Sequence, residues 1–350
     1  MSASAVSGCS QRVMTEEVFG QTAEGEAVHR HVISGGGLTA AVLTLGAAIQ
    51  DLRLADHGAP LVLGFETLDD YLRHPSYFGA IVGRYANRIA AGRFTIDGER
   101  FQADLNEAGK HSLHGGREGF AQQVWRCVDS GDDFVSLALH DPDGSMGFPG
   151  ALDVTCTYRL RLPGTLSIEL EAVCDAPTLC NLAHHSYFNL DNGGTGDILD
   201  HRLMINASAY LPVDEEQIPT GFVVPVAGTA FDFQLSRPIR TEDGDQIPYD
   251  HNFCLAAARR PLQLAAWAQG TGSGVEMEVW TTEPGIQFYA GHKLDPDLAG
   301  LQGIRYRPHA GFCLEPQIWP DSPNHPHFPQ AVLRPGEIYR QVTEYRFRLG

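Results

Sequence analysis

Alternation between apolar and polar residues is the sequence feature that most limits how this chain can fold. Residues 152–162 (LDVTCTYRLRL) carry an apolar side chain at every second position, and residues 166–172 do the same after Pro163-Gly164. Successive side chains of a strand point to opposite faces, so a period of two buries one face and leaves the other in water. We therefore predict a half-buried antiparallel hairpin over 152–172.

The same pattern recurs in other parts of the chain. RFTIDGERFQADL (93–105) alternates around Asp97-Gly98, a dipeptide that suits a tight hairpin turn, and TEYRFRL (343–349) alternates near the C-terminus. Helical periodicity is confined to ETLDDYLRH (66–74). We predict an all-β fold, a large antiparallel β-sandwich with few short helices, whose open concave face gathers polar side chains from several strands.

Charge and cysteine content narrow the class of protein. A formal net charge of −18 over 350 residues argues against nucleic acid as a partner, because such binding needs lysine and arginine on phosphates. No window approaches the roughly 18 consecutive apolar residues of a membrane helix. The seven cysteines form no C-x-x-C pair, which is typical of core thiols in a reducing compartment, so we expect a cytoplasmic protein. No linker or repeat divides the chain, and we predict a disordered N-terminus (1–12) followed by one domain (13–350).

Five segments place polar or ionisable side chains in apolar or glycine-rich surroundings. A carboxylate at the end of an apolar strand, such as Glu315, must be paired, or else its pKa is raised, which describes a candidate general base or a structural ion pair. Arg88 fits a structural pair as well as a site, and a lone histidine in a strand is often a core residue. The candidates are Asn87 and Arg88, His111 and His114, His184, His185 and Asn189, Asp250 and His251, and Glu315.

Motifs for other chemistries are absent from the sequence or incomplete. His325 and His327 in NHPHF lie two positions apart, but no third metal ligand is nearby and prolines mark the segment as an irregular loop. We therefore predict no metal site. The sequence has no phosphate-binding glycine loop before a helix, no G-x-S-x-G elbow and no dinucleotide fingerprint.

Seven motifs in one order resemble the aldose 1-epimerase (galactose mutarotase) family and cover nearly the whole chain. They are VFGQTAEGEAVHRHVI, GAIVGRYANRIAAGRFTIDG, NEAGKHSLHGG, YLPVDEEQIPTG, YDHNF, TTEPGIQFYAG and LEPQIWPDSPNHPHFPQAVLRPGEIY. The resemblance implies the galactose mutarotase-like supersandwich and a cofactor-free interconversion of the α and β anomers of free aldohexoses. A small sugar is the implied ligand, and the protein is expected to be a monomer or homodimer.

The resemblance also implies roles for particular residues. Glu315 matches the base that takes the proton of the C1 hydroxyl, and His185 in HSYFNL matches the acid that protonates the ring oxygen. His114 of LHGG is implied beside both oxygens as a second polar group. The positions that match sugar-binding residues are Arg88, Asn87, Asp250 and Gln287.

General chemistry agrees with this assignment. An imidazole of pKa about 6.5 exchanges protons near neutral pH, and a glutamate whose pKa is raised by an apolar environment becomes a base of comparable strength. An aromatic ring is expected to stack on the apolar face of the sugar, with Phe288, Trp280 and Trp319 as candidates.

One departure and three alternatives remain open. The family usually has asparagine directly before the catalytic histidine, where this chain has His184, which either supports the strand or orients a neighbouring loop. A glycosidase using Glu315 and Asp250 leaves the histidine motifs unexplained. A silent sugar-binding module needs no acid–base pair, and a hexose-6-phosphate epimerase needs a basic cluster, for which Arg88 and Arg117 are available.

Overall fold

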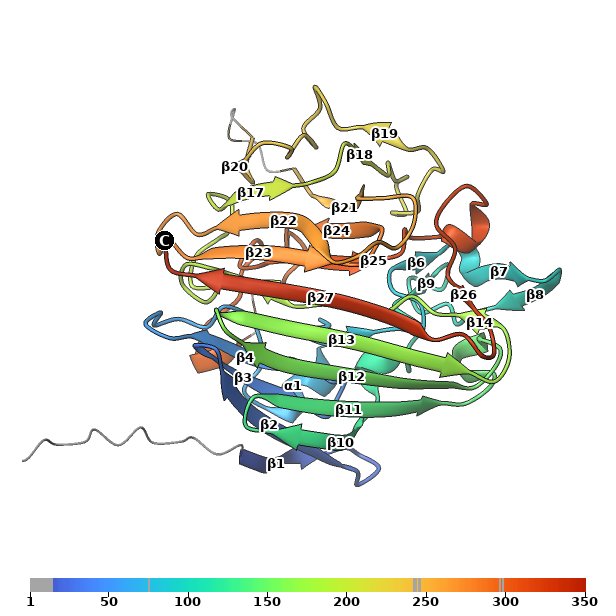
Figure 1. Cartoon of the computed structure of the whole chain (residues 1–350), viewed down its shortest axis with the longest axis horizontal. Coiled ribbons are helices and arrows are strands. Elements are labelled where there is room, and N and C mark those ends of the chain that lie inside the picture. The colour runs from blue at the N-terminus through green and yellow to red at the C-terminus, as the bar shows by residue number, and fades with distance from the viewer. Residues whose placement is uncertain (1–14, 75, 242–243, 245–246, 296, 298) are drawn as a thin grey trace, which may run out of the picture.

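The computed structural model describes residues 15–74, 76–241, 244, 247–295, 297 and 299–350 (Figure 1). The predicted disordered segment 1–12 lies outside these residues. Three antiparallel sheets dominate, and α1 (Leu68–Arg73), within the one segment with helical periodicity, is the only α-helix of the described part. The same described part has five short 3₁₀ turns, at Ala90–Gly92, Phe120–Gln122, Ser145–Gly147, Leu301–Gly303 and Ser322–Asn324.

The largest sheet has nine strands and forms the front layer in Figure 1. Its order is β10 (Arg126–Gly131), β11 (Phe134–Asp141), β12 (Leu152–Arg161), β13 (Thr165–Cys174), β27 (Tyr339–Arg348), β23 (Glu276–Thr281), β22 (Gln263–Gln269), β17 (Arg202–Ile205) and β20 (Arg237–Pro238). The predicted hairpin is confirmed as β12–β13, and its alternate apolar side chains are buried.

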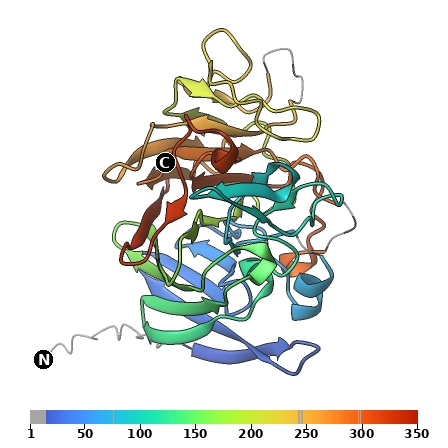
Figure 2. The ribbon, with the colours of Figure 1, turned by 90° about the vertical axis from the view of Figure 1, so that its right-hand side faces the viewer.

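Two smaller sheets lie against this layer. A four-stranded sheet contains β1 (Thr15–Gln21), β2 (Ala27–Gly35), β3 (Leu38–Leu43) and β4 (Ile49–Leu54). A six-stranded sheet has the order β16 (Tyr187–Phe188), β25 (Phe312–Gln317), β24 (Gly285–Tyr289), β21 (Asp250–Cys254), β18 (Ala209–Tyr210) and β19 (Val224–Pro225). Figure 2 shows the blue N-terminal strands at one end of the molecule and the orange strands at the other.

One continuous core joins the three sheets. It contains residues from β2–β4, from the inward face of the nine-stranded sheet and from the six-stranded sheet, including Ile33, Leu137, Tyr345 and Leu314. Hydrogen bonds also cross the layers, since Tyr345 donates to the Leu314 carbonyl at 2.9 Å. The all-β sandwich expected from alternation is confirmed.

The described residues also form four two-stranded ribbons. They are β5 (Ile81–Val82) with β15 (Ala183–His184), β6 (Arg88–Ile89) with β9 (Ser112–Leu113), β7 (Arg93–Ile96) with β8 (Glu99–Gln102), and β14 (Thr178–Leu179) with β26 (Val332–Leu333). In the β7–β8 hairpin both turn residues have positive φ, 50° at Asp97 and 87° at Gly98, as the dipeptide predicts.

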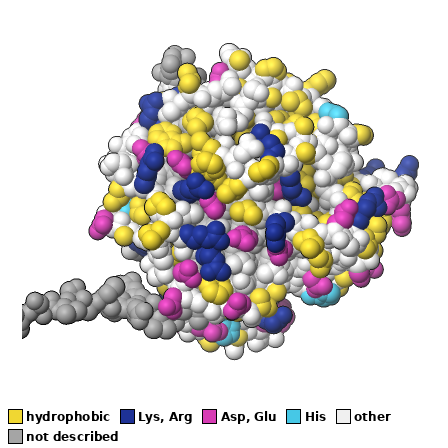
Figure 3. All heavy atoms as spheres, in the orientation of Figure 1, with side chains coloured by type: hydrophobic (Ala, Val, Ile, Leu, Met, Phe, Trp, Pro, Cys, Tyr) yellow, Lys and Arg dark blue, Asp and Glu magenta, His cyan; other side chains and the backbone are white. Residues whose placement is uncertain are grey.

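The outward face of the nine-stranded sheet carries interleaved positive and negative side chains (Figure 3). Ion pairs there include Arg346 with Glu344 and Arg161 with Glu169. No helix of the described residues is long and apolar enough to span a membrane.

A buried ion pair links the ribbons to the nine-stranded sheet and predicts a large stability effect. Arg84 donates through Nε to Asp141 at 2.8 Å, and both residues are at most 2% exposed. Breaking a buried pair leaves an uncompensated charge, so Asp141→Asn is expected to lower the unfolding free energy by about 3–5 kcal/mol in urea titrations. The exposed pair of Asp97 with Arg334 is the control, and Asp97→Asn should leave the unfolding midpoint unchanged. Equal midpoints for the two variants would contradict this prediction.

Candidate active site

All seven residues expected to form the site line one cavity. The cavity has a volume of about 320 Å³ and lies beside the six-stranded sheet, a size suited to a small ligand. It contains Asn87, Arg88, His114, His185, Asp250, Gln287 and Glu315. A larger groove of about 1070 Å³ between the β1–β2 turn and β10–β12 contains none of them.

Strand alternation explains how the six-stranded sheet supplies three of these side chains. Gln287 on β24 is paired with both Glu315 on β25 and Asn252 on β21, while Tyr289 is paired with Asp250 and Cys313. Paired residues share a face, so the site face of this sheet is largely polar. The opposite face, with Phe288 and Leu314, is fully buried in the core.

His185 follows β15 and lies beside Glu315. Its Nε2 is 3.5 Å from Glu315 Oε2, and its Nδ1 is 3.7 Å from Cys313 Sγ. Hydrogen bonds fix its backbone, because its N–H donates to the Ala80 carbonyl and its carbonyl accepts from Gly79 N–H. Glu315 Oε2 is buried and has no hydrogen-bond partner among the described residues, so it is free to accept a proton.

His184 faces away from this cavity, as neighbouring strand residues do. Its ring packs against Tyr158 and Tyr345, and its Nδ1 is 3.5 Å from the Tyr158 hydroxyl. Burial lowers the pKa of His184 to about 3, which keeps the ring neutral. The two adjacent histidines therefore do not form a paired site, and His184 supports the strand.

His114 is held as a neutral hydrogen-bond donor. Its backbone N–H donates to the Asn87 carbonyl, and its Nδ1 accepts from the Asn87 backbone N–H at 3.2 Å. A neutral ring that accepts at Nδ1 carries its proton on Nε2. Burial, followed by His185 and Arg88, holds the pKa of His114 well below its ordinary value.

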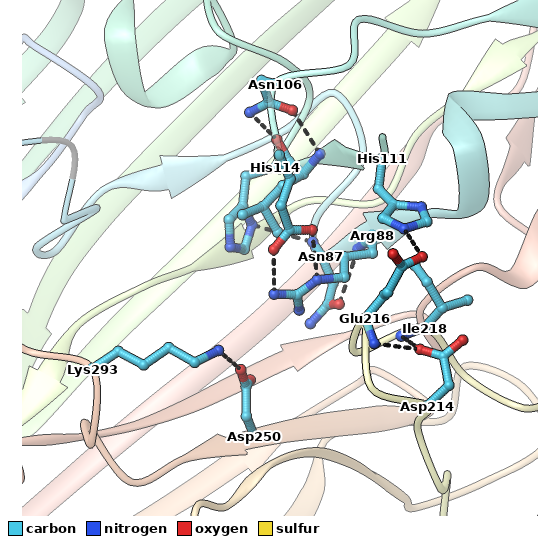
Figure 4. Close-up of polar contacts among 12 residues, drawn as sticks. Asn87, Arg88, Asn106, His111, His114, Asp214, Glu216, Ile218, Asp250 and Lys293 are labelled. Atoms are coloured by element: carbon cyan, nitrogen blue, oxygen red, sulfur yellow. Dashed lines mark hydrogen bonds and ion pairs between the residues drawn. The ribbon is translucent and has the colours of Figure 1, made fainter. Parts of the chain in front are cut away.

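Arg88 and Asp250 are each fixed by partners (Figure 4). Arg88 donates from two nitrogens to the Glu107 carboxylate at 2.8 and 2.6 Å. Asp250 accepts from Gln287 Nε2 at 2.8 Å and from Lys293 Nζ at 3.3 Å. Burial alone would raise the pKa of Asp250, but Arg88, Lys293 and Gln287 together lower it, so this residue is a fixed anion.

The protein environment raises the proton affinity of Glu315 and lowers that of His185. Burial, reinforced by Asp250 and opposed by Arg88, raises the pKa of Glu315 well above its ordinary value. Burial lowers the pKa of His185 to about 4. The two groups lie 3.5 Å apart, close enough for their titrations to be coupled.

The ligand atoms of His114, His185 and Glu315 lie within 4.8 Å of one another, a grouping that a metal ion could use. Nε2 of His114 carries its hydrogen as long as Nδ1 accepts from the Asn87 amide, so a metal there would have to break that bond. The donor set therefore fits proton transfer better than metal binding. His325 and His327 lie outside the cavity, bound to Asp321 and to the Gly221 carbonyl.

Other candidates from the sequence lie elsewhere. Asn189 is fully buried and donates to the Ala310 carbonyl at 2.8 Å. The ring of His251 packs against Phe231, and His111 binds Glu216. Arg117 is paired with Asp104 and does not line the cavity.

The expected stacking aromatics are wrong. Phe288 is fully buried in the core, Trp280 stacks with Arg346 on the outward face, and Trp319 packs against Phe328. Each is on a face or in a cluster that the site does not touch. The aromatic residues that line the cavity are Tyr77, Tyr187 and Tyr289.

Sequence reasoning also missed Glu107, Lys293 and the three tyrosines. A buried arginine needs a carboxylate partner. Glu107, which lies within the NEAGKHSLHGG motif, could therefore have been predicted as the partner of Arg88. Tyr187 on β16 and Tyr289 on β24 lie within quoted motifs, and Tyr289 shares a strand face with Gln287, so alternation could have indicated it. Lys293 and Tyr77 lie in loops, where no such pattern applies.

Fold and cavity together define a β-sandwich protein with a buried acid–base pair in a polar pocket. Residues 29–346 match the family model described as aldose 1-epimerase. Galactose mutarotase from Rattus norvegicus is 42% identical over 96% of this chain and 99% of its own, and aldose 1-epimerase from Escherichia coli is 40% identical over 89% and 92%. The chain belongs to the aldose 1-epimerase family.

Solved structures agree with this assignment. An aldose epimerase homologue from C. elegans has a TM-score of 0.85 and 31% identity, covering 91% of this chain and 98% of its own. Galactose 1-epimerase from Lactobacillus acidophilus has a TM-score of 0.81 and 28% identity, covering 96% and 99%.

Proposed function

We propose that this protein is an aldose 1-epimerase that interconverts the α and β anomers of free aldohexoses, galactose or glucose, by acid–base catalysis. The observation that carries the proposal is the buried Glu315–His185 pair, 3.5 Å apart at the wall of a polar cavity. A binding module has no need for two titratable groups whose pKa values are shifted in opposite directions.

Ring opening and closure use the pair in both directions. Glu315 takes the proton of the C1 hydroxyl, and the electron pair of that O–H bond forms the C1 carbonyl as the bond from C1 to the ring oxygen breaks. His185 donates its Nε2 proton to the ring oxygen. Rotation about C1–C2 presents the other carbonyl face, the hydroxyl attacks C1, and the two protons return along the same paths.

The remaining side chains hold the sugar while its ring opens. His114 Nε2–H donates to the ring or C1 oxygen and stabilises the negative charge that develops there. The Asp250 carboxylate accepts from sugar hydroxyls, and the Asn87 amide, Arg88 and Gln287 donate to sugar oxygens. His114, Arg88, Asp250 and Gln287 are already oriented by the contacts described above, so binding requires little reorganisation.

Two alternatives fit the contacts less well. In a glycosidase Asp250 would act as the second carboxyl group, but its oxygens are held by Gln287 and Lys293 and its pKa is lowered. For a 6-phosphate sugar, Arg88 is neutralised by Glu107 and Arg117 lies outside the cavity. The unphosphorylated sugar is therefore favoured.

The proposal also covers the cellular location, oligomeric state and domain organisation of the enzyme. We place it in the cytoplasm as a monomer or homodimer, with residues 13–350 acting as one domain. Its support is the free state of the six described cysteines and the single core that extends from Ile33 to Phe347.

The pH dependence of kcat/KM is expected to be bell-shaped. The acid limb should lie near pH 4, because burial lowers the pKa of His185 to about 4. Below that pH both members of the pair are protonated, and no base remains for the C1 hydroxyl. The alkaline limb should lie well above the ordinary pKa of a glutamate, where the Glu315–His185 pair loses its last proton. Polarimetric initial rates across the pH range measure both limbs. An acid limb near the pH 6.5 of a free imidazole would contradict the burial argument.

Polarimetry on freshly dissolved α-galactose and α-glucose tests the activity. We expect relaxation faster than the spontaneous rate, unchanged by a chelator, with galactose 6-phosphate relaxed more slowly. Absence of acceleration with every sugar, together with retained sugar binding by calorimetry, would support the silent module instead. Faster relaxation of the phosphate ester would support a hexose-6-phosphate epimerase.

A further inference from the structure

Tyr77 lies at the wall of the cavity between α1 and β5, in a segment that no motif marks. The centroid of its ring is 4.7 Å from that of His114, with an interplanar angle of 58°. The centroid of the same ring is 5.7 Å from that of His185, with an interplanar angle of 30°. One side chain therefore contacts both imidazoles of the site.

The backbone of Tyr77 is held in a conformation that bulky residues avoid. Its φ is +58°, in the left-handed region that favours glycine. The turn after it is closed by the Ala80 N–H, which donates to the Tyr77 carbonyl at 3.1 Å. Gly79 and Ala80 of this turn are also the hydrogen-bond partners of the His185 backbone. Strain of this kind persists where the surrounding structure requires it and is concentrated at functional sites.

We propose that Tyr77 is a positioning residue for anomer interconversion, its ring fixing the planes of His114 and His185 and keeping water from their shared side. The inference rests on the proposed function for its kinetic consequences. The ring is the part assigned this role, because the ring makes the contacts with both imidazoles. Burial, with Glu107 adding to it, raises the pKa of Tyr77 to about 12, so the phenol stays neutral.

Removing the ring should admit water to both imidazoles. Burial is the leading cause of the lowered pKa of His185, so that pKa should rise toward 6.5 when the ring is lost. The other titratable or charged groups near His185 are Glu315 and Cys313 on β25, His114, Tyr187, Asp250 and Arg88. Of these groups His114 also contacts the Tyr77 ring, so the pKa values of His185 and His114 should be followed together.

Three variants test the proposal. Tyr77→Gly removes the ring and also relaxes the backbone, because glycine adopts positive φ freely. Its kcat is expected to fall roughly 10- to 100-fold with KM changed less than about threefold, since misplaced catalytic groups lose rate more than binding. The acid limb of the pH profile should move upward. Tyr77→Phe keeps the ring and should match the wild type.

Tyr71→Leu is the matched control for a loosened segment. Tyr71 lies on α1 and packs against Phe65 and Phe19, outside the cavity. Its loss should lower the melting temperature and leave kcat and the pH profile unchanged. If Tyr77→Gly behaves like Tyr71→Leu, the role of Tyr77 is only structural and the proposal is overturned. Loss of rate in Tyr77→Phe equal to that in Tyr77→Gly would also overturn it.

A readout independent of turnover separates this proposal from the proposed function. The titration of the His185 and His114 ring protons, followed by NMR in the wild type and Tyr77→Gly, gives their pKa values directly. Raised values in Tyr77→Gly support the positioning role even if no sugar is turned over, and unchanged values overturn it. Failure of the proposed function is seen separately, as a wild-type protein that accelerates no sugar.

Discussion

Glu315→Gln is expected to lower kcat for mutarotation by about 10²- to 10⁴-fold while sugar binding is retained. Glutamine fills the same space and keeps an oxygen at the cavity wall, but it cannot take the C1 hydroxyl proton. The carboxylate has no hydrogen bond through Oε2 to lose among the described residues, so the change should disturb little else. Polarimetric progress curves and calorimetric binding measure the two effects.

Stability provides the control for this variant. Folding raises the pKa of Glu315, so the folded state binds this proton more tightly than the unfolded state does. The resulting gain in stability is fully present below the unfolded pKa and is lost as the pH rises through the folded pKa. Glutamine removes that loss, and at alkaline pH Glu315→Gln should melt no lower than the wild type. Near-normal rates in a folded variant would show that Glu315 is not the base.

His185→Asn is expected to lower kcat by about 10²- to 10⁴-fold and to remove the acid limb near pH 4. The reason is that the ring oxygen then departs without a proton donor at the Nε2 position. Steady-state rates across the pH range measure both consequences.

His184→Asn is the matched control for His185→Asn. The two histidines are adjacent, but His184 packs against Tyr158 and Tyr345, and its Nε2 is buried without a partner among the described residues. Asparagine is the residue expected at this position from the family pattern, and we expect a kcat within about threefold of the wild type. A large loss of kcat in His184→Asn with no loss in His185→Asn would reverse the assignment.

Much of the fold could be predicted from the alternation of apolar and polar residues, because alternation is a local property of the sequence. The β12–β13 and β7–β8 hairpins and the C-terminal strand β27 follow from period-two runs and turn dipeptides, and all three are observed. The order of the nine-stranded sheet does not follow, since β13 and β27 are neighbours although more than 160 residues separate their ends. Pairings of this kind depend on long-range packing that no short window contains.

Residues of the candidate site could be predicted where a charged side chain stands in an apolar stretch of sequence. Glu315 after an apolar run and Arg88 in an apolar segment are such conflicts, and both residues line the cavity. Phe288 was misplaced because a one-residue offset on a strand changes the face, as its neighbour Gln287 shows. Trp280 was misplaced because it belongs to the nine-stranded sheet, which its local sequence does not reveal. No sequence pattern marks Tyr77 as a residue of the site, because its position depends on a positive φ that its neighbours impose.

The pathway of the C1 oxygen tests the central claim most directly. Ring opening breaks the bond between C1 and the ring oxygen and keeps the C1 hydroxyl oxygen on the sugar, whereas displacement at C1 by water, as in a glycosidase, replaces it. Mutarotation of α-galactose in ¹⁸O-labelled water, quenched early and analysed by mass spectrometry, distinguishes the two. We predict that the wild type forms the β anomer without ¹⁸O beyond the enzyme-free control. One ¹⁸O atom gained for each β anomer formed would contradict acid–base ring opening by Glu315 and His185.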